Sequence, residues 1–291
     1  MSPQPVRMGK TAYGTEAAAH ASSASHGPAL SRRRPARSDR ERGGSELVRG
    51  FAAPLDGLAH PLDLSASMMC ARLDQMAVEV GRLESAGVDS YHFDVMDGHF
   101  VPSLGFSCDA IGALRPHTKL PFHVHAMVEN PQAFLDGMAR AGCDLYVFHV
   151  EATRYPRRMV DRVHDAGMKC GIAVSPGTPL DYLNEGHGAE QVLVMGVEPG
   201  FAAQRFFADT PQRIDEIRKR ISPTVEVGLD GHVTADTSLA SLAAGASLFV
   251  CGTSVLFARP GGYASNVRRL RGALTKGSLS ASAEHGAKGR K

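Results

Sequence analysis

Short runs of β-branched and aromatic residues alternate with helix-length segments from Leu64 onward. Such runs predict strands, because these residue types favour the pleated and buried positions of a sheet. Eight strand-and-helix units can be counted, and alternation of this kind is typical of a parallel α/β sheet. The predicted strands lie at 64–69, 90–97, 121–128, 145–151, 169–175, 191–197, 224–230 and 247–253, and a plausible helix follows each of them.

One junction recurs four times along the chain, as AGVDSYHF, AGCDLYVF, AGMKCGIA and AGASLFVC. In each copy a Gly ends a helix and a short turn leads into a strand. Eight such units within about 210 residues are compact but within the range of a (β/α)₈ TIM barrel. We therefore expect an α/β fold with one barrel domain over residues 61–275. An open Rossmann-like sheet is the alternative, and no G-x-G-x-x-G motif supports it.

The two ends of the chain differ in composition from this domain. Residues 1–60 are rich in Ala, Ser, Gly, Pro and Arg and have no sustained apolar period, so we expect a disordered extension there. An organelle transit peptide or an extended start are alternative interpretations of this Arg-rich segment. Residues 276–291 are predicted to form a disordered basic tail.

Bulk properties narrow the possible partners. The chain has 291 residues, 43% of them hydrophobic, but no apolar run approaches the roughly 20 residues that span a bilayer. The net charge of +2 resides in the two tails and leaves the middle mildly acidic, so we expect neither a nucleic-acid nor a membrane partner. Five cysteines without a C-x-x-C pair suit a reducing compartment, and we expect a cytoplasmic protein.

Polar residues appear where the predicted strands end, which is where barrels of this type carry their chemistry. By the period of two, His92, Asp94 and Met96 share one face of the second strand. The third strand places His123, His125 and Met127 in the same way, and the seventh ends in Asp230. A structural role is the alternative for a single inward histidine, but two carboxylates are costly to bury without a cation. A mixed N/O site for Zn²⁺, Fe²⁺, Mn²⁺ or Co²⁺ could therefore form from His92, Asp94, His125 and Asp230.

Several segments together resemble one enzyme family. HFDVMDGHFVPS, HVHAMVENP, VEPGFAAQRF and LDGHVTADT, followed by AAGASLFVCGTS, are similar to ribulose-phosphate 3-epimerases, and the resemblance covers roughly residues 62–274. It implies a ketose-phosphate 3-epimerase, an isomerase that converts D-ribulose 5-phosphate to D-xylulose 5-phosphate in the pentose phosphate pathway. It also implies one divalent cation bound by His92, Asp94, His125 and Asp230, with Asp94 and Asp230 as the paired acid and base. No organic cofactor is expected.

The chemistry of this reaction fits the predicted residues. Inverting C3 of a 2-ketose removes a proton beside the carbonyl and returns one to the opposite face, which requires two groups on opposite sides of a planar intermediate. A cation on the C2 and C3 oxygens would act as a Lewis acid that stabilises the enediolate.

The resemblance also implies a set of substrate-binding residues. Ser67 matches a serine that contacts substrate, and Met96, Met127 and Met195 match methionines around the reacting carbons, although simple packing is an alternative for all four. Barrels commonly hold a phosphate in the loops after strands seven and eight and at a short helix N-terminus. We expect the sugar phosphate at Gly200, Phe201, Ala202, Ala203, Gly231, His232, Gly252 and Thr253.

Some positions depart from the family pattern. The loops read GFAAQ, DGH and CGTS where the family usually has GFGGQ, DGG and GS. The alanines add methyl groups where a ligand approaches, and His232 could either shrink the pocket or assist an anion. SMMC, GFAxQ and GTSxLF look closer to the allulose-6-phosphate 3-epimerase branch. His123 and Ser175 replace an acidic residue and an Asn of the family, and we expect them to be supporting or structural changes.

Three functional hypotheses remain: a ribulose-5-phosphate epimerase, an epimerase of another ketose phosphate such as D-allulose 6-phosphate, and a non-catalytic sugar-phosphate-binding barrel. Retention of all four predicted ligands argues against the third. The partner is expected to be a small phosphorylated ketose, and the family suggests a homo-oligomer.

Overall fold

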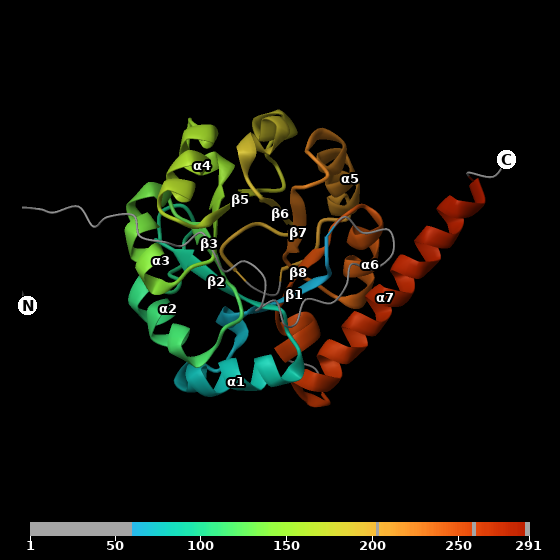
Figure 1. Cartoon of the computed structure of the whole chain (residues 1–291), viewed down its shortest axis with the longest axis horizontal. Helices are drawn as coiled ribbons and strands as arrows, with labels where there is room; N and C mark the ends of the chain where they lie inside the picture. Colours follow the sequence, from blue (N-terminus) through green and yellow to red (C-terminus); the bar gives the residue numbers. More distant parts are fainter. Residues whose placement is uncertain (1–59, 202–203, 258–259, 289–291) are drawn as a thin grey trace, which may run out of the picture. The chain divides into compact units, whose positions relative to one another are not determined.

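Eight parallel strands close into a barrel in the order β1-β2-β3-β4-β5-β6-β7-β8 (Figure 1). The computed structural model describes residues 60–201, 204–257 and 260–288. The predicted TIM barrel is confirmed, and the open sheet is excluded because β1 pairs with both β2 and β8. The strands are β1 (Asp63–Ser67), β2 (Ser90–Met96), β3 (Phe122–Met127), β4 (Leu145–His149), β5 (Lys169–Val174), β6 (Gln191–Met195), β7 (Glu226–Asp230) and β8 (Leu248–Cys251).

The strands end at the predicted residue or up to two residues before it. After Ser67 the chain enters a 3₁₀ turn at Met68–Cys70, and after His149 it enters another at Val150–Ala152. The apolar run continues past the last ladder hydrogen bond at these points, so the hydrophobic pattern alone overestimates strand length. The extra residues belong to the loops at the C-terminal ends of the strands.

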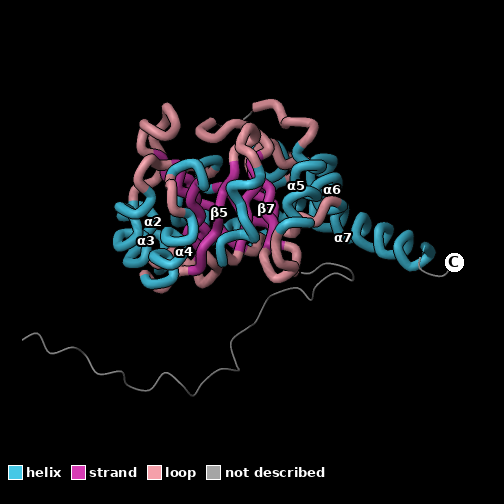
Figure 2. Tube along the Cα trace, turned by 90° about the horizontal axis from the view of Figure 1, so that it is seen from above, coloured by secondary structure: helices cyan, strands magenta, loops and turns pink. Residues whose placement is uncertain are grey.

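Helices surround the barrel (Figures 1 and 2), and the loops gather at the two ends of the strands. The helices are α1 (Met76–Ala86), α2 (Cys108–Leu114), α3 (Leu135–Ala141), α4 (Pro156–Asp165), α5 (Thr210–Arg220), α6 (Ala235–Ala243) and α7 (Gly262–Lys288). Between β5 and β6 the predicted α-helix is instead a 3₁₀ helix, Leu180–Gly188. Gly186 and Gly188 both adopt positive φ angles there, which an α-helix does not accommodate.

Helix α7 continues past the predicted domain boundary at residue 275 and reaches Lys288. Figure 1 shows its last turns extending beyond α6. In the structure this helix covers residues 276–288 of the stretch predicted as a disordered basic tail. The predicted disorder of residues 1–59 and 289–291 lies outside the described residues.

The repeated Gly junctions end helices as predicted. Gly87 follows α1 with φ 90° and Gly142 follows α3 with φ 80°, and the N–H of each bonds back to the last helical turn. A side chain is strained in this left-handed conformation, whereas Gly adopts it at no steric cost. The chain is thereby turned directly into β2 and β4.

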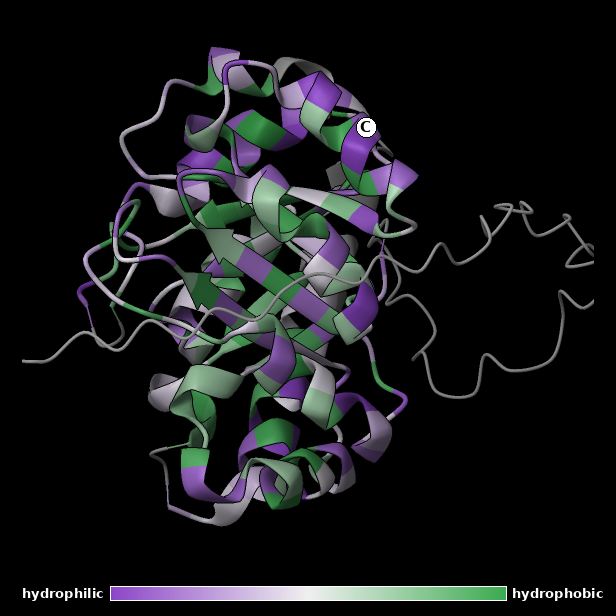
Figure 3. Cartoon of the chain, turned by 90° about the vertical axis from the view of Figure 1, so that its left-hand side faces the viewer, coloured by the Kyte–Doolittle hydropathy of each residue, from purple (hydrophilic) through white to green (hydrophobic). Residues whose placement is uncertain are grey.

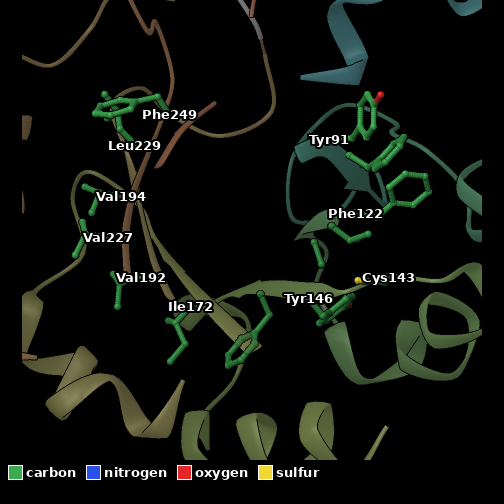
Figure 4. Close-up of a cluster of buried hydrophobic side chains, with 14 of the residues drawn as sticks. Tyr91, Phe122, Cys143, Tyr146, Ile172, Val192, Val194, Val227, Leu229 and Phe249 are labelled. Atoms are coloured by element: carbon green, nitrogen blue, oxygen red, sulfur yellow. The ribbon is translucent and has the colours of Figure 1, made fainter. Parts of the chain in front are cut away.

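Strand residues alternate between the barrel interior and the layer under the helices, and Figure 3 shows the matching alternation of hydrophobic and hydrophilic positions. The outward residues form the main hydrophobic core, part of which appears in Figure 4 with Tyr91, Phe122 and Tyr146. A smaller apolar cluster fills the interior with Leu145, Val147, Ala173, Leu193, Leu248 and Val250. The inward-facing polar residues of β2, β3 and β7 therefore lie on strands whose interior is packed by this apolar cluster.

Helix α7 makes polar contacts with α1 and with the residue that precedes β2. Arg271 contacts the Asp89 carboxylate at 2.6 Å, and Asp89 Oδ2 accepts the N–H of Leu64 on β1 at 2.8 Å. Nearer the start of α7, the Tyr263 hydroxyl donates to the fully buried Glu79 of α1. In the part of the chain that the structure describes, no helix is long and apolar enough to cross a membrane.

Candidate metal and active site

Strands β2, β3 and β7 bring two histidines and two aspartates together at their C-terminal ends. Asp94 of β2 lies directly opposite His125 of β3 in the ladder, and the inward alternation of β2 adds His92. Asp230 ends β7 beside Met195 of β6. One ligand atom from each of the four side chains lies within 4.8 Å of all the others. The structure therefore joins the four residues that the sequence places on three separate strands.

Nitrogen and oxygen atoms alternate around this cluster. His92 Nε2 lies 3.3 Å from Asp94 Oδ1 and 3.6 Å from Asp230 Oδ2. His125 Nδ1 lies 3.3 Å and 3.4 Å from the same two oxygens. Each imidazole nitrogen thus faces both carboxylates, as four ligands around a common centre would.

The cluster is buried and its nitrogens lack ordinary partners. His92 and His125 are almost wholly inaccessible, and Asp94 is 7% exposed. Although the nitrogens lie within ion-pair distance of the carboxylates, His92 Nε2 and His125 Nδ1 accept or donate no hydrogen bond among the described residues. Buried polar atoms without partners are costly, and a divalent cation would satisfy all four groups at once. The residues present therefore fit a metal ion.

Proton affinities in the cluster reflect the same electrostatics. Burial alone would lower the pKa of His125, but the carboxylates of Asp230 and Asp94 outweigh it and raise the pKa to about 9. Burial alone would raise the pKa of Asp94, yet the two imidazoles hold it well below its usual range. The site strongly favours a positive charge between the carboxylates.

Asp94 and Asp230 of the cluster also line a cavity at the C-terminal face of the barrel. Every described residue that the sequence assigned to substrate lines this cavity, whereas Ala202 and Ala203 lie outside the described residues. The described set is Ser67, Met96, Met127, Met195, Gly200, Phe201, Gly231, His232, Gly252 and Thr253.

Apolar side chains flank the carboxylates. Met96 and Met127 pack with Val101 into a small buried cluster, against which Met69 and Phe100 also lie. Met195 is 3% exposed and belongs to the same cavity wall. Thioether side chains can follow the shape of a small ligand and exclude water from the cluster.

The far end of the cavity is formed by the loops after β6, β7 and β8. Gly231 has φ 106°, and a Cβ there would lie 2.9 Å from the Val197 backbone nitrogen, so only Gly fits this close approach. His232 adopts φ 49°, an uncommon conformation for a residue with a side chain. Thr234 then caps α6, so the helix N-terminus begins directly behind this loop.

Comparison with known proteins supports the resemblance. The model of the ribulose-phosphate 3 epimerase family matches residues 63–256. Ribulose-phosphate 3-epimerase 1 of Cupriavidus necator is 38% identical over 225 residues, which are 73% of this chain and 92% of the relative. The chain belongs to the ribulose-phosphate 3-epimerase family. Within that family, a cytoplasmic isoform from Oryza sativa subsp. japonica is 34% identical over 212 residues, 71% of this chain and 92% of the relative.

Solved structures add the fold alone. A mutant tryptophan synthase alpha-subunit of Pyrococcus furiosus has a TM-score of 0.56 at 13% identity, covering 72% of this chain and 97% of its own. Orotidine 5'-phosphate decarboxylase of Pyrococcus horikoshii has a TM-score of 0.54 at 14% identity, covering 72% and 98%. Both likenesses confirm the barrel.

Nothing in these comparisons supports the expected features of the allulose-6-phosphate branch. The curated relatives reported above carry the name ribulose-phosphate 3-epimerase. The short strings SMMC and GTSxLF were therefore a weaker guide than the whole barrel, because they sample only a few loop positions.

Several residues that were not identified from the sequence line the same cavity. Met69, Cys70, Glu198, Gln204 and Ser254 also line the cavity. Gln204 could have been found from the GFAAQ string, and its amide bonds the carbonyls of Glu198 and Phe201 at 2.6 Å and 3.0 Å. The other four lie just past strand ends, where no periodic signal distinguishes them.

His123 and Ser175, the two residues that replace an acidic residue and an Asn of the family, lie in different parts of the barrel. His123 lies on the inward face of β3, two residues before His125 and away from the cavity, and burial lowers its pKa to about 3. Ser175 follows β5, and its hydroxyl lies 3.3 Å from Nδ1 of His149, a buried histidine on β4. His149 was not identified from the sequence.

Proposed function

We propose that this protein is a metal-dependent ribulose-phosphate 3-epimerase that interconverts D-ribulose 5-phosphate and D-xylulose 5-phosphate by inverting C3. The proposal rests on one observation: carboxylate oxygens and imidazole nitrogens alternate around a common centre. Asp94 and Asp230 each lie 3.3–3.6 Å from the same two imidazole nitrogens. Membership of the family supports the choice of a pentose phosphate.

The two carboxylates have separate tasks on the two faces of the sugar. Each turns one oxygen toward the imidazoles, Oδ1 in Asp94 and Oδ2 in Asp230, so each keeps a second oxygen that can hold a proton. In one direction one carboxylate removes the C3 proton and the other returns a proton to the opposite face. In the reverse direction their tasks exchange.

His92, Asp94, His125 and Asp230 would hold one divalent cation, and their mixed donors suit Zn²⁺, Fe²⁺, Mn²⁺ or Co²⁺. When bound, the cation supplies Lewis acidity that stabilises negative charge on the sugar oxygens beside C3. No organic cofactor is needed for this proton transfer.

The remaining cavity residues position the sugar. Met96, Met127 and Met195 exclude water beside the reacting carbons, and Ser67 offers a hydroxyl at the same end. The phosphate would lie at the opposite end, where the loops containing Gly200, Gly231 and Gly252 approach the N-terminus of α6. Backbone N–H groups at such a helix end favour an anion. A homo-oligomer stays a prediction, which light scattering of the purified chain would test.

A side-by-side assay tests the choice of substrate. The metal-loaded full-length protein is supplied with D-ribulose 5-phosphate and, separately, with D-allulose 6-phosphate. The proposal expects a clearly higher kcat/KM for D-ribulose 5-phosphate. A preference for the six-carbon sugar would assign a different ketose phosphate, and absence of epimerisation of either sugar would favour a non-catalytic barrel.

A further inference from the structure

A second histidine lies behind the metal-site histidine of β3. His149, the last residue of β4, is fully buried, and its Nε2 lies 2.9 Å from Nε2 of His125. The two ring planes are 24° from parallel with centroids 5.0 Å apart, so the rings meet edge to edge through these nitrogens. Phe100 covers the other side of His149, at 4.8 Å between ring centroids. The imidazole of His149 is therefore held in one orientation.

A carboxylate completes the arrangement on the far side of His149. Glu151 Oε2 lies 3.0 Å from His149 Nδ1. Glu151 Oε1 accepts the Ser175 backbone N–H at 2.8 Å and also the hydroxyl of Thr178. Because Oε1 of Glu151 already accepts two hydrogen bonds, as an ionised carboxylate does, the proton in the contact between Glu151 Oε2 and His149 Nδ1 is assigned to His149 Nδ1.

These contacts determine where each proton lies. A neutral imidazole with a proton on Nδ1 has a lone pair on Nε2, so His149 accepts from Nε2–H of His125. In the metal-bound protein, where a cation would replace the proton on His125 Nδ1, that nitrogen then offers its lone pair to the site, 3.3 Å and 3.4 Å from the oxygens of Asp94 and Asp230. The opposite assignment would leave a proton on the very nitrogen that has to bind a cation.

We propose that Glu151 and His149 form a relay that fixes the tautomer and ring orientation of His125 and so tunes metal affinity. The inference rests on the proposed metal-dependent function, because it assigns the relay to the same cation. His149 and Glu151 touch neither the cavity nor the cluster centre, so they are positioning residues. Groups that orient a metal-bound histidine in this way typically change metal affinity 10–100-fold when removed.

The first test measures Zn²⁺ affinity of the full chain in competition with a chelator. His149→Phe keeps an aromatic ring between His125 and Phe100 but removes both nitrogens, and Zn²⁺ should bind 10–100-fold more weakly. His149→Gln can accept from His125 and donate to Glu151, so it should recover most of the loss. Binding by His149→Phe within threefold of the unchanged protein would overturn the relay.

The chain offers a matched control. His164 Nε2 lies 3.0 Å from Glu190 Oε2, the same kind of pair, but on the partly exposed outer side of the barrel. His164→Phe should leave Zn²⁺ affinity unchanged. An equal loss in both Phe variants would indicate a general effect of the substitution and would contradict the relay.

The second test observes the tautomers directly and needs no variant. Long-range ¹H–¹⁵N spectra of the Zn²⁺-loaded protein should show protons on His149 Nδ1 and His125 Nε2. A proton on His149 Nε2 would overturn the relay even if metal binds. Failure of the unchanged protein to bind Zn²⁺ at this cluster would overturn both the relay and the proposed function. Metal binding with the wrong tautomer would overturn the relay alone, so the two failures are distinguishable.

Discussion

Asp94 Oδ1 and Asp230 Oδ2 lie 3.3 Å and 3.4 Å from one atom, Nδ1 of His125. Strands β2 and β7 are not neighbours in the barrel, so this convergence depends on closure of the sheet. Two carboxylates that share a histidine can bind one cation and still leave an oxygen each for proton transfer.

Asp94→Asn tests the acid–base task of that residue. Asn keeps the shape of the side chain and one oxygen, but it cannot take up the C3 proton. We expect kcat to fall by about 10²–10⁴-fold while the circular dichroism spectrum is unchanged. Asp236→Asn is the matched control, because Asp236 lies exposed in the first turn of α6 outside the cavity. Near-normal turnover of Asp94→Asn would refute the assignment.

Removal of metal should lower stability as well as activity. Burial of four polar groups without a cation is costly. Because Zn²⁺ would bind the folded chain only, a hundredfold excess over its Kd should raise the free energy of unfolding by about 2.7 kcal/mol. For a domain of this size that corresponds to a rise in Tm of roughly 5–10 °C, measurable by differential scanning calorimetry. The rise should disappear in Asp230→Ala. An equal rise in that variant would place the ion elsewhere.

His123 should make the protein sensitive to acid. Burial, with Lys169 and His92 nearby, lowers its folded pKa from 6.5 to about 3. The unfolded chain therefore binds a proton that the folded chain refuses, so stability falls as the pH drops from 6.5 toward 3, by about 1.4 kcal/mol per pH unit. Urea unfolding at several pH values should show a shallower slope for His123→Gln. His164→Gln is the control, and a slope unchanged in His123→Gln would disprove the effect.

Asp97 should order the loop that carries Phe100. Its Oδ1 accepts the N–H groups of His99 and Phe100 at 2.8 Å and 2.9 Å, and its Oδ2 accepts that of Glu129 at 2.8 Å. Asp97→Ala loses all three bonds and should lower the free energy of unfolding by roughly 1–3 kcal/mol. Asp97→Asn keeps an oxygen for the first two and should lose less. Equal stabilities of the two variants in urea unfolding would contradict this graded role.

The sequence predicted the strands, and the period of two predicted which polar side chains of β2 and β3 share a face. The period of two puts His92 and Asp94 on one face of β2, and parallel pairing puts His125 directly opposite Asp94. In a barrel of parallel strands, every strand has its C-terminal end at the same face. Asp230 of β7 could therefore be expected near the other two strands without knowledge of any side-chain contact.

The rest depends on contacts that periodicity does not contain. His149 follows Leu145 and Val147 on the inward face of β4, but its contact with His125 depends on the rotation of its ring, which Phe100 packs against. The cavity wall at Glu198 and Ser254 lies in loops whose course is set by tertiary packing. The reach of α7 to Lys288 was not predicted, because residues 276–288 mix helix formers with Gly277, Gly286 and three serines.

Solvent exchange at C3 tests the central claim most directly. The metal-loaded protein is incubated with D-ribulose 5-phosphate in D₂O, and substrate and product are analysed by mass spectrometry at early conversion. Two opposed carboxylates predict D-xylulose 5-phosphate carrying one deuterium at C3, while recovered substrate retains its protium. Deuterium entering the recovered substrate as fast as the product, or no exchange at all, would contradict the account.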